Sequence, residues 1–236
     1  MSNLKKFASS TAELKYNVLR RLGQLLLVDI VTGVCLFVGA GTIQWFYAVV
    51  YIALCGMVTL LAPFVAPLEI LAERGSKKRN VEKWDKVIAK LLVLSGFSIY
   101  VIAGLDFRWR WTPDLSTTWH VWAIILFLLG FALMVWAMSA NRFFSTAVRI
   151  QFERGHEVCM TGPYRYVRHP GYLGMITYYL VTPIFLGSLW AMIPALATMI
   201  LFVIRTVLED KTLIKKLPGY KDYTVRTRYR LIPGIW

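Results

Sequence analysis

The sequence predicts an all-α, polytopic membrane protein with about six transmembrane helices, the last two forming a helical hairpin. Of its 236 residues, 57% are hydrophobic, and the mean hydropathy of +0.55 exceeds what a soluble domain of this size can cover with polar surface. The apolar residues are gathered in runs long enough to cross a bilayer. The Lys and Arg residues lie between these runs or at their ends.

Each spanning helix needs about 20 residues, and six apolar runs meet this need: 22–40, 43–68, 87–105, 119–140, 170–187 and 189–207. Only Leu186-Gly187-Ser188 separates the last two runs, which predicts a tight hairpin. Pro183 and Pro194 can kink or shorten its helices, so a re-entrant pair is the alternative. We therefore divide the chain into a four-helix membrane region, residues 1–140, and a C-terminal core, residues 141–236.

The basic residues predict an orientation. The N-terminal segment holds 5 Lys and Arg, the connection 74–90 holds 7, 106–118 holds 2, 141–171 holds 5, and the segment from Arg205 onward holds 8. One set of alternate connections therefore holds 25 Lys and Arg residues and the other set holds 2, which places both termini and the connection 141–171 in the cytoplasm.

We expect a retained first helix and no removed signal peptide. The net charge of +14 then reflects orientation and anionic lipid, not nucleic acid.

Few chemically active residues fall inside the spans. Asp29 lies in the first run, but no companion acids or bases on the other runs suggest a proton or ion path, so we expect a helix-to-helix hydrogen bond. Cys35, Cys55 and Cys159 have no CxxC spacing and no associated His pattern. The sequence therefore predicts free thiols and no metal site.

The connection 141–171 is patterned differently from the others. Val148, Ile150 and Phe152 alternate with polar residues at 149, 151 and 153, which predicts a short strand or an extended arm. The chain then returns through 156–160 to the segment GPYRYVRHPGYLG at 162–174. We expect this connection to be ordered enough to bind a ligand.

A helix is expected to begin at Pro170, because a proline at the first helical position loses no intrahelical bond. The positive helix end then lies beside Arg168 and His169, in a pocket suited to carboxylate, phosphate or ribose oxygens. The alternative is a basic interfacial loop that anchors a membrane helix to lipid headgroups.

The predicted hairpin brings the end of the last span to the same side as this segment. Arg168 and His169 should therefore lie near Glu209 and Asp210, and Arg205 can pair with Glu209 four residues later. Acidic groups suit an ammonium or ribose, Arg suits a carboxylate, and tyrosine suits a purine or a cation. S-adenosylmethionine offers all of these groups, although a nucleotide fits the residue types almost as well.

The segments HEVCMTGPYRYVRHPGYLG, RTVLED and LPGYKDYTVRTRYRLIP together resemble the isoprenylcysteine carboxyl methyltransferase and phospholipid methyltransferase superfamily of integral-membrane enzymes. The resemblance covers about residues 141–236, whereas the first half is similar only in being helical membrane sequence. It implies methyl transfer from S-adenosylmethionine to a lipophilic acceptor, most simply the carboxylate of a prenylated cysteine. Phospholipid, amine or thiol methylation, an NADPH-dependent sterol-reductase-like enzyme and a small transporter are the alternatives.

The resemblance also implies functional residues. Those for the cofactor are His156 and Val158 beside the adenosyl part, Gly162 and Tyr164 in the pocket wall, Arg168, His169, Pro170, Tyr172 and Gly174 around the methionine end and ribose, and Glu209 with Asp210 closing the site. Val158 stands where the family has Leu, and Asp210 where it has a second Glu. Arg168 is predicted to orient a carboxylate acceptor, Glu209 to deprotonate an amine or thiol acceptor, and Arg205 to contact the substrate.

Overall fold

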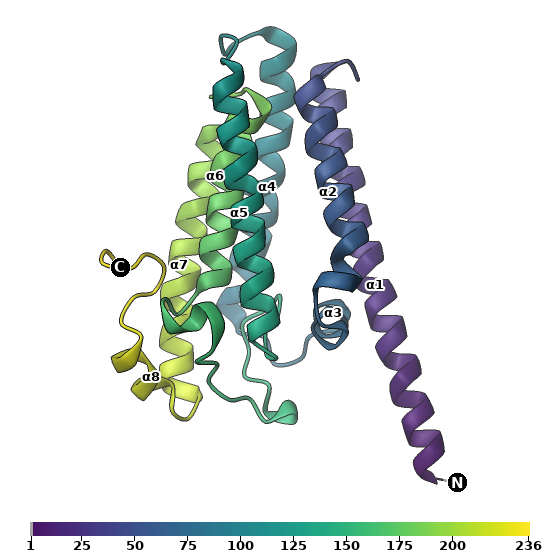
Figure 1. Ribbon diagram of the computed structural model, residues 1–236, viewed down its shortest axis with the longest axis vertical. Helices are drawn as coiled ribbons and strands as arrows, with labels where there is room; N and C mark the ends of the chain where they lie inside the picture. The colour runs from purple at the N-terminus through teal and green to yellow at the C-terminus, as the bar shows by residue number, and fades with distance from the viewer. Residues whose placement is uncertain (1) are drawn as a thin grey trace.

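The computed structural model describes the backbone of residues 2–236 and the side chains of residues 11–236. Within this part all regular structure is helical, which confirms the predicted all-α membrane class (Figure 1). The α-helices are α1 (Ser2–Ala40), α2 (Phe46–Val65), α3 (Leu68–Gly75), α4 (Lys83–Trp109), α5 (Thr117–Ala140), α6 (Pro170–Leu186), α7 (Met192–Lys216) and α8 (Tyr220–Arg226). Two short 3-10 helices, η1 (Phe152–Arg154) and η2 (Gly162–Arg165), lie between α5 and α6.

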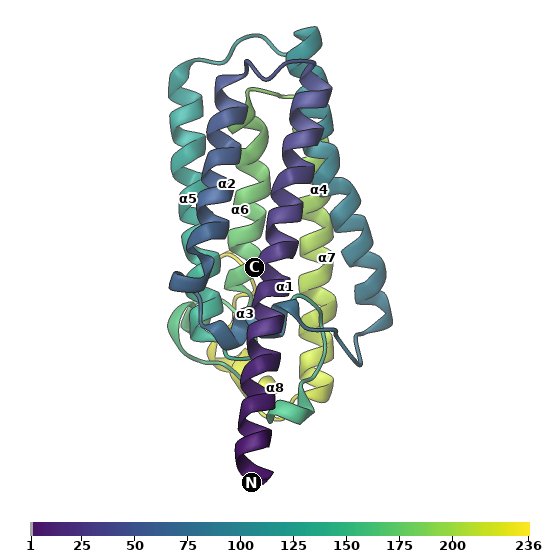
Figure 2. The same ribbon diagram turned by 90° about the vertical axis from the view of Figure 1, so that its right-hand side faces the viewer.

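Five helices in the described part are long and apolar enough to cross a membrane, namely α1, α2, α4, α5 and α7. The sixth expected span corresponds to α6, which has 17 residues and is therefore about 26 Å long, slightly short of the hydrocarbon core. Gly187 reverses the chain after α6 with a φ of 76°. Helices α6 and α7 lie side by side in both views, so the predicted hairpin is confirmed (Figures 1 and 2).

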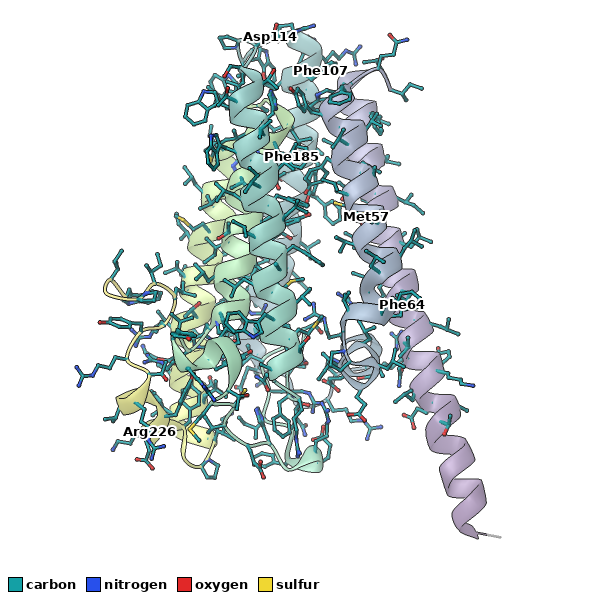
Figure 3. All side chains as sticks on the ribbon, viewed as in Figure 1. Met57, Phe64, Phe107, Asp114, Phe185 and Arg226 are labelled. Carbon is teal, nitrogen blue, oxygen red and sulfur yellow. The ribbon has the colours of Figure 1, made fainter. Side chains whose placement is uncertain are left out.

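One end of the bundle, which we call the loop end, holds the short helix α3, the connection 141–169 and α8 (Figure 1). Figure 3 shows mainly carbon on the side chains around the middle of the bundle, whereas nitrogen and oxygen atoms gather at the loop end, where Arg226 is labelled. The exposed side chains of the middle, such as Phe64 and Met57, are apolar. This distribution fits helices surrounded by lipid, with polar side chains gathered at the loop end.

Glycines set two of the helix contacts. A Cβ on Gly174 of α6 would lie 2.5 Å from the carbonyl oxygen of Gly130 in α5, and a Cβ on Gly104 of α4 would lie 2.6 Å from the carbonyl oxygen of Leu36 in α1. Larger residues there would force the backbones apart. The close approach of α5 and α6 fixes the start of α6, where the Arg168-His169 segment lies.

The predicted helix-to-helix hydrogen bond of Asp29 is confirmed. The hydroxyl of Thr59 in α2 donates to Asp29 Oδ2 in α1 at 2.7 Å. The acid therefore joins the first two helices.

The alternating segment around Val148 forms no strand within the described chain, so the strand alternative is wrong and the extended arm is observed. Several of its polar groups find partners outside a sheet. The Val148 N–H donates to Asp85 Oδ2 at 2.8 Å, the Glu82 N–H donates to the Val148 carbonyl at 3.1 Å, and Gln151 Nε2 donates to the Phe143 carbonyl at 2.6 Å. The arm pairs with the start of α4 and not with a second strand. Its apolar and polar residues do not separate into a buried and an exposed face, because Arg149 and Gln151 are buried and Phe152 is 73% exposed.

Candidate functional site

A cavity lies at the loop end between the extended arm, the start of α6, the end of α7 and α8, with about 820 Å³ of empty space including its mouth. Seven of the eleven predicted cofactor residues line it: His156, Val158, Tyr164, Arg168, His169, Tyr172 and Glu209. The structure therefore gathers most of the predicted residues, which come from three separate stretches of chain, around one space.

The expected meeting of the Arg168-His169 segment with the end of α7 is confirmed. Arg168 donates from Nε to Asp210 Oδ1 at 3.0 Å and from Nη2 to Oδ2 at 2.8 Å, and His169 Nε2 lies 3.2 Å from Oδ1. The side chains of Arg168 and Asp210 are 5% and 1% exposed, so this two-pronged ion pair is buried. Such a fork combines charge attraction with fixed geometry.

Asp210 also holds the C-terminal segment. The Tyr220 hydroxyl donates to Oδ1 at 2.9 Å, and Arg230 Nε donates to Oδ2 at 2.9 Å. The same carboxylate therefore joins the start of α6, the end of α7, α8 and the residues after α8. Asp210 does not line the cavity itself but lies directly behind Arg168 and His169.

Arg168 lines the cavity, yet most of its donors are engaged elsewhere. Besides Asp210, its Nη1 donates to the carbonyls of Thr227 and Arg228 at 2.9 and 2.8 Å. Four of its five N–H donors are thus used to fasten the C-terminal tail. Its predicted role in orienting a carboxylate acceptor stays a prediction, and its observed contacts hold the cavity together.

The expected pairing of Arg205 with Glu209 is wrong. Arg205 instead binds Asp85 of α4, with Nε to Oδ1 at 2.8 Å and Nη2 to Oδ2 at 3.2 Å. Asp85 is buried and needs a counter-charge, and α4 packs against α7 at this level. Glu209 is left to accept a hydrogen bond from the Tyr172 hydroxyl, at the wall of the cavity.

His156 is held as a neutral acceptor. Its Nδ1 accepts from the Gln151 N–H at 3.3 Å, and its ring lies 4.5 Å from the Phe143 ring, centre to centre. Burial, together with the charges of Arg149 and Arg154, lowers the pKa of His156 to about 4. The imidazole therefore carries no charge into the cavity at neutral pH.

This depressed pKa predicts a loss of stability in acid. In the unfolded chain the pKa of His156 is near its ordinary value of about 6.5. Between pH 6.5 and 4 the unfolded state therefore binds more protons than the folded state, so the free energy of unfolding decreases as the pH is lowered. We expect His156→Gln to reduce the drop in unfolding temperature between pH 7.5 and pH 5 in detergent. Equal drops in variant and parent would show that the buried imidazole accepts a proton without cost.

Three other predicted residues lie behind the cavity wall. Gly174 contacts α5, Pro170 begins α6 as expected, and Gly162, with a φ of 55°, begins η2. None of the three is among the residues that line the cavity. These three residues shape the backbone that carries the lining side chains.

Sequence reasoning missed several lining residues, among them Asn141, Gln151, Tyr220 and Tyr223. The two tyrosines belong to the C-terminal motif of the resemblance, so the sequence could have indicated them as site residues. Nothing in the spacing of Asn141 and Gln151 pointed to the cavity, because their placement depends on how the connection folds back.

A second cavity adjoins the first, with about 1040 Å³ of empty space including its mouth. The two share the wall residues Phe144, Ser145, Gly171 and Tyr172. Away from the loop end its lining is mostly apolar and aromatic and comes from α1, α4, α5, α6 and α7, including Gly96, Phe97, Met134, Met175, Tyr179 and Phe202. We call the first space the polar cavity and the second the apolar cavity.

Part of the chain is similar in sequence to known proteins. Residues 123–215 match the family described as "Isoprenylcysteine carboxyl methyltransferase (ICMT) family". Two relatives described as "Probable protein-S-isoprenylcysteine O-methyltransferase", from Oryza sativa subsp. indica and subsp. japonica, are each 29% identical over 120 residues. The aligned region is 50% of this chain and spans 62% of the length of each relative. The resemblance read from the sequence is confirmed for residues 123–215, which match the isoprenylcysteine carboxyl methyltransferase family, whereas residues 216–236 lie outside this match.

Proposed function

We propose that the protein is a membrane methyltransferase that moves a methyl group from S-adenosylmethionine to a lipophilic acceptor, most simply the carboxylate of a prenylated cysteine. The observation that carries the proposal is the junction of the two cavities, which meet at Gly171 and Tyr172 inside the region that matches the family. A polar donor and an apolar acceptor need adjoining sites of this kind, because their reacting atoms must be aligned.

The residues of the polar cavity fit S-adenosylmethionine. His169 and Gly171 lie at the positive end of α6, which favours a carboxylate. Glu209 is an acceptor for an ammonium or for ribose hydroxyls, and Tyr164 and Phe143 offer aromatic surface for a purine. The bound donor supplies an activated methyl group on a sulfonium; the protein's own residues bind it and hold it in place.

The apolar cavity fits an isoprenoid chain. Its lining includes Val28 of α1 and Val93 of α4, which are 47% and 59% exposed on the outside of the helices. The rim between these two helices therefore faces lipid, so a lipophilic acceptor can enter sideways from the bilayer. We further propose that the loop end faces the cytoplasm, in line with the distribution of Lys and Arg.

The chain's contribution to the reaction is alignment and exclusion of water. A carboxylate acceptor has a pKa of about 3.3–3.7 and is already ionised at neutral pH, so no general base is needed. Glu209 adds negative charge on the donor side, and Tyr172 both holds Glu209 and separates the two cavities.

A binding titration of the purified protein with S-adenosylmethionine, S-adenosylhomocysteine and NADPH tests the donor. We expect the first two ligands to bind with dissociation constants in the micromolar range, and we expect no binding of NADPH. Transfer of radiolabelled methyl to an N-acetylated S-prenyl cysteine, and not to phosphatidylethanolamine, is then expected in vesicles. Binding of NADPH alone would replace the proposal with a reductase, and transfer to the amine alone would replace the acceptor.

A further inference from the structure

The apolar cavity has a cationic end that the family match does not cover. Arg74 lies in α3, outside the matched residues 123–215, and lines the apolar cavity. Its guanidinium carbon is 5.2 Å from the ring centre of Phe144, a residue shared by both cavities. Arg74 therefore sits close to the place where donor and acceptor would meet.

Contacts on two sides hold the backbone of α3 in place, and they therefore fix the position of Arg74 in the cavity wall. A Cβ on Gly75 would overlap the carbonyl oxygen of Asn17, which shows how closely α3 contacts α1. On the other side Glu73 Oε1 accepts from Ser145 Oγ at 3.1 Å and pairs with Arg149 Nη2 at 3.2 Å. Ser145 itself lines both cavities.

Two of the neighbouring cations are paired with acids, but Arg74 and Arg21 are not: Arg21 Nη1 donates only to the neutral Gln24, and its buried Nε has no partner within the described chain. Arg205, the other cation of the apolar cavity, is neutralised by Asp85, and Glu73 is paired with Arg149. Among the side chains of residues 11–236, Arg74 makes no hydrogen bond or ion pair. Burial, with the charges of Arg21 and Arg205 nearby, lowers the pKa of the Arg74 guanidinium to about 9. A half-buried cation without a counter-ion carries part of the cost of desolvation, and an anionic ligand would offset that cost.

We propose that Arg74 binds the carboxylate of the acceptor and thereby makes the enzyme select anionic over cationic methyl acceptors. This inference rests on the function proposed above and sharpens it to ester formation. A protonated amine headgroup would meet the like charge of Arg74 and be disfavoured. Arg74 is thus a specificity-determining residue supplied by the N-terminal half of the chain.

The charge balance of the reaction agrees with this role. A carboxylate oxygen forms a bond to the methyl carbon while the bond from that carbon to sulfur breaks and its electron pair stays on sulfur. The anionic acceptor and the cationic donor become a neutral methyl ester and a neutral thioether, and no proton moves. The product ester has lost the charge that Arg74 attracts, so it is released to the lipid more readily than the acceptor.

The test compares Arg74→Gln and Arg74→Lys with Arg79→Gln, an exposed arginine on the same connection. We expect Arg74→Gln to raise the KM for an N-acetylated S-prenyl cysteine about ten- to hundredfold, the usual effect of losing a hydrogen bond to a charged group. Arg74→Lys should lose less, because it keeps the charge without the fork. Arg79→Gln should match the parent, and the Kd for S-adenosylmethionine should be unchanged in all three.

Direct binding separates the failure of this inference from failure of the methyltransferase assignment. In nanodiscs the S-prenyl cysteine carboxylate should bind the parent about tenfold or more tightly than its neutral amide, and Arg74→Gln should abolish that difference. Removing an unpaired charge should not lower the unfolding temperature. Equal preference for the carboxylate in Arg74→Gln would overturn the inference. A second outcome is that no methyl is transferred to any acceptor while the tighter binding of the carboxylate still depends on Arg74. That result would support the anion site and contradict the proposed methyl transfer.

Discussion

Asp210→Asn is expected to release the C-terminal segment from the helices and to abolish binding of the methyl donor. The Asp210 carboxylate is 1% exposed and accepts hydrogen bonds from Arg168, Tyr220 and Arg230. Removing its charge leaves the buried Arg168 guanidinium without a counter-ion, which costs about 3–5 kcal/mol when one partner of a buried pair is lost. The unfolding temperature in detergent should therefore fall markedly, and the donor titration should become flat.

Asp222→Asn on the exposed side of α8 is the matched control and should behave like the parent. Limited proteolysis provides a second readout, because the residues after α8 are held by Arg168 through the carbonyls of Thr227 and Arg228. We expect faster cleavage there in Asp210→Asn. A variant that binds the donor normally and resists the protease would show that Asp210 does not hold the site together.

The parts of this site that depend on chain connectivity were readable from the sequence. A short break at Gly187 between two apolar runs dictates a hairpin, and a hairpin brings the start of one helix to the end of the next. The meeting of Arg168 with Asp210 follows from that fact, although the pairing geometry does not. Motif residues such as Tyr172 and Glu209 reached the cavity for the same reason.

The parts that depend on packing were not readable. Arg205 has a possible partner four residues away in Glu209, but α4 presents Asp85 to it, 120 positions away in the chain. Arg74 was one of seven basic residues in a connection whose charge predicts only orientation. Its place in the apolar cavity comes from the packing of α3 against α1, which no local pattern in the sequence records.

The charges of the two cavities are complementary to those of the proposed reactants. Glu209 lines the polar cavity, where a cationic donor is proposed, and Arg74 lines the apolar cavity, where an anionic acceptor is proposed. Opposite charges held apart until both ligands are bound would favour approach of the ligands across the shared wall at Tyr172. Both charges disappear from the reactants on methyl transfer, which favours release of both products.

Glu209→Gln is expected to weaken binding of the methyl donor, and with it methyl transfer, while the fold around the site stays intact. The substitution keeps the size of the side chain and an acceptor for the Tyr172 hydroxyl, but it removes the negative charge that Glu209 contributes to the polar cavity. A charge-assisted contact contributes about 1.5–3 kcal/mol, so affinity for S-adenosylmethionine should fall about ten- to hundredfold. Glu13→Gln, at an exposed acidic residue that lines neither cavity, is the control and should change affinity little.

Comparison of donor and product then shows which group Glu209 serves. S-adenosylhomocysteine lacks the sulfonium charge but keeps the ammonium and the ribose. If Glu209 acts on the sulfonium, Glu209→Gln should weaken S-adenosylmethionine and leave S-adenosylhomocysteine nearly unchanged; equal weakening would place the carboxylate on the ammonium or ribose instead. Tyr172→Phe, which keeps the charge and removes only the hydrogen bond, should have a smaller effect than Glu209→Gln on both ligands. Unchanged affinity for both ligands in Glu209→Gln would remove Glu209 from the donor site, and with it the charge complementarity between the two cavities.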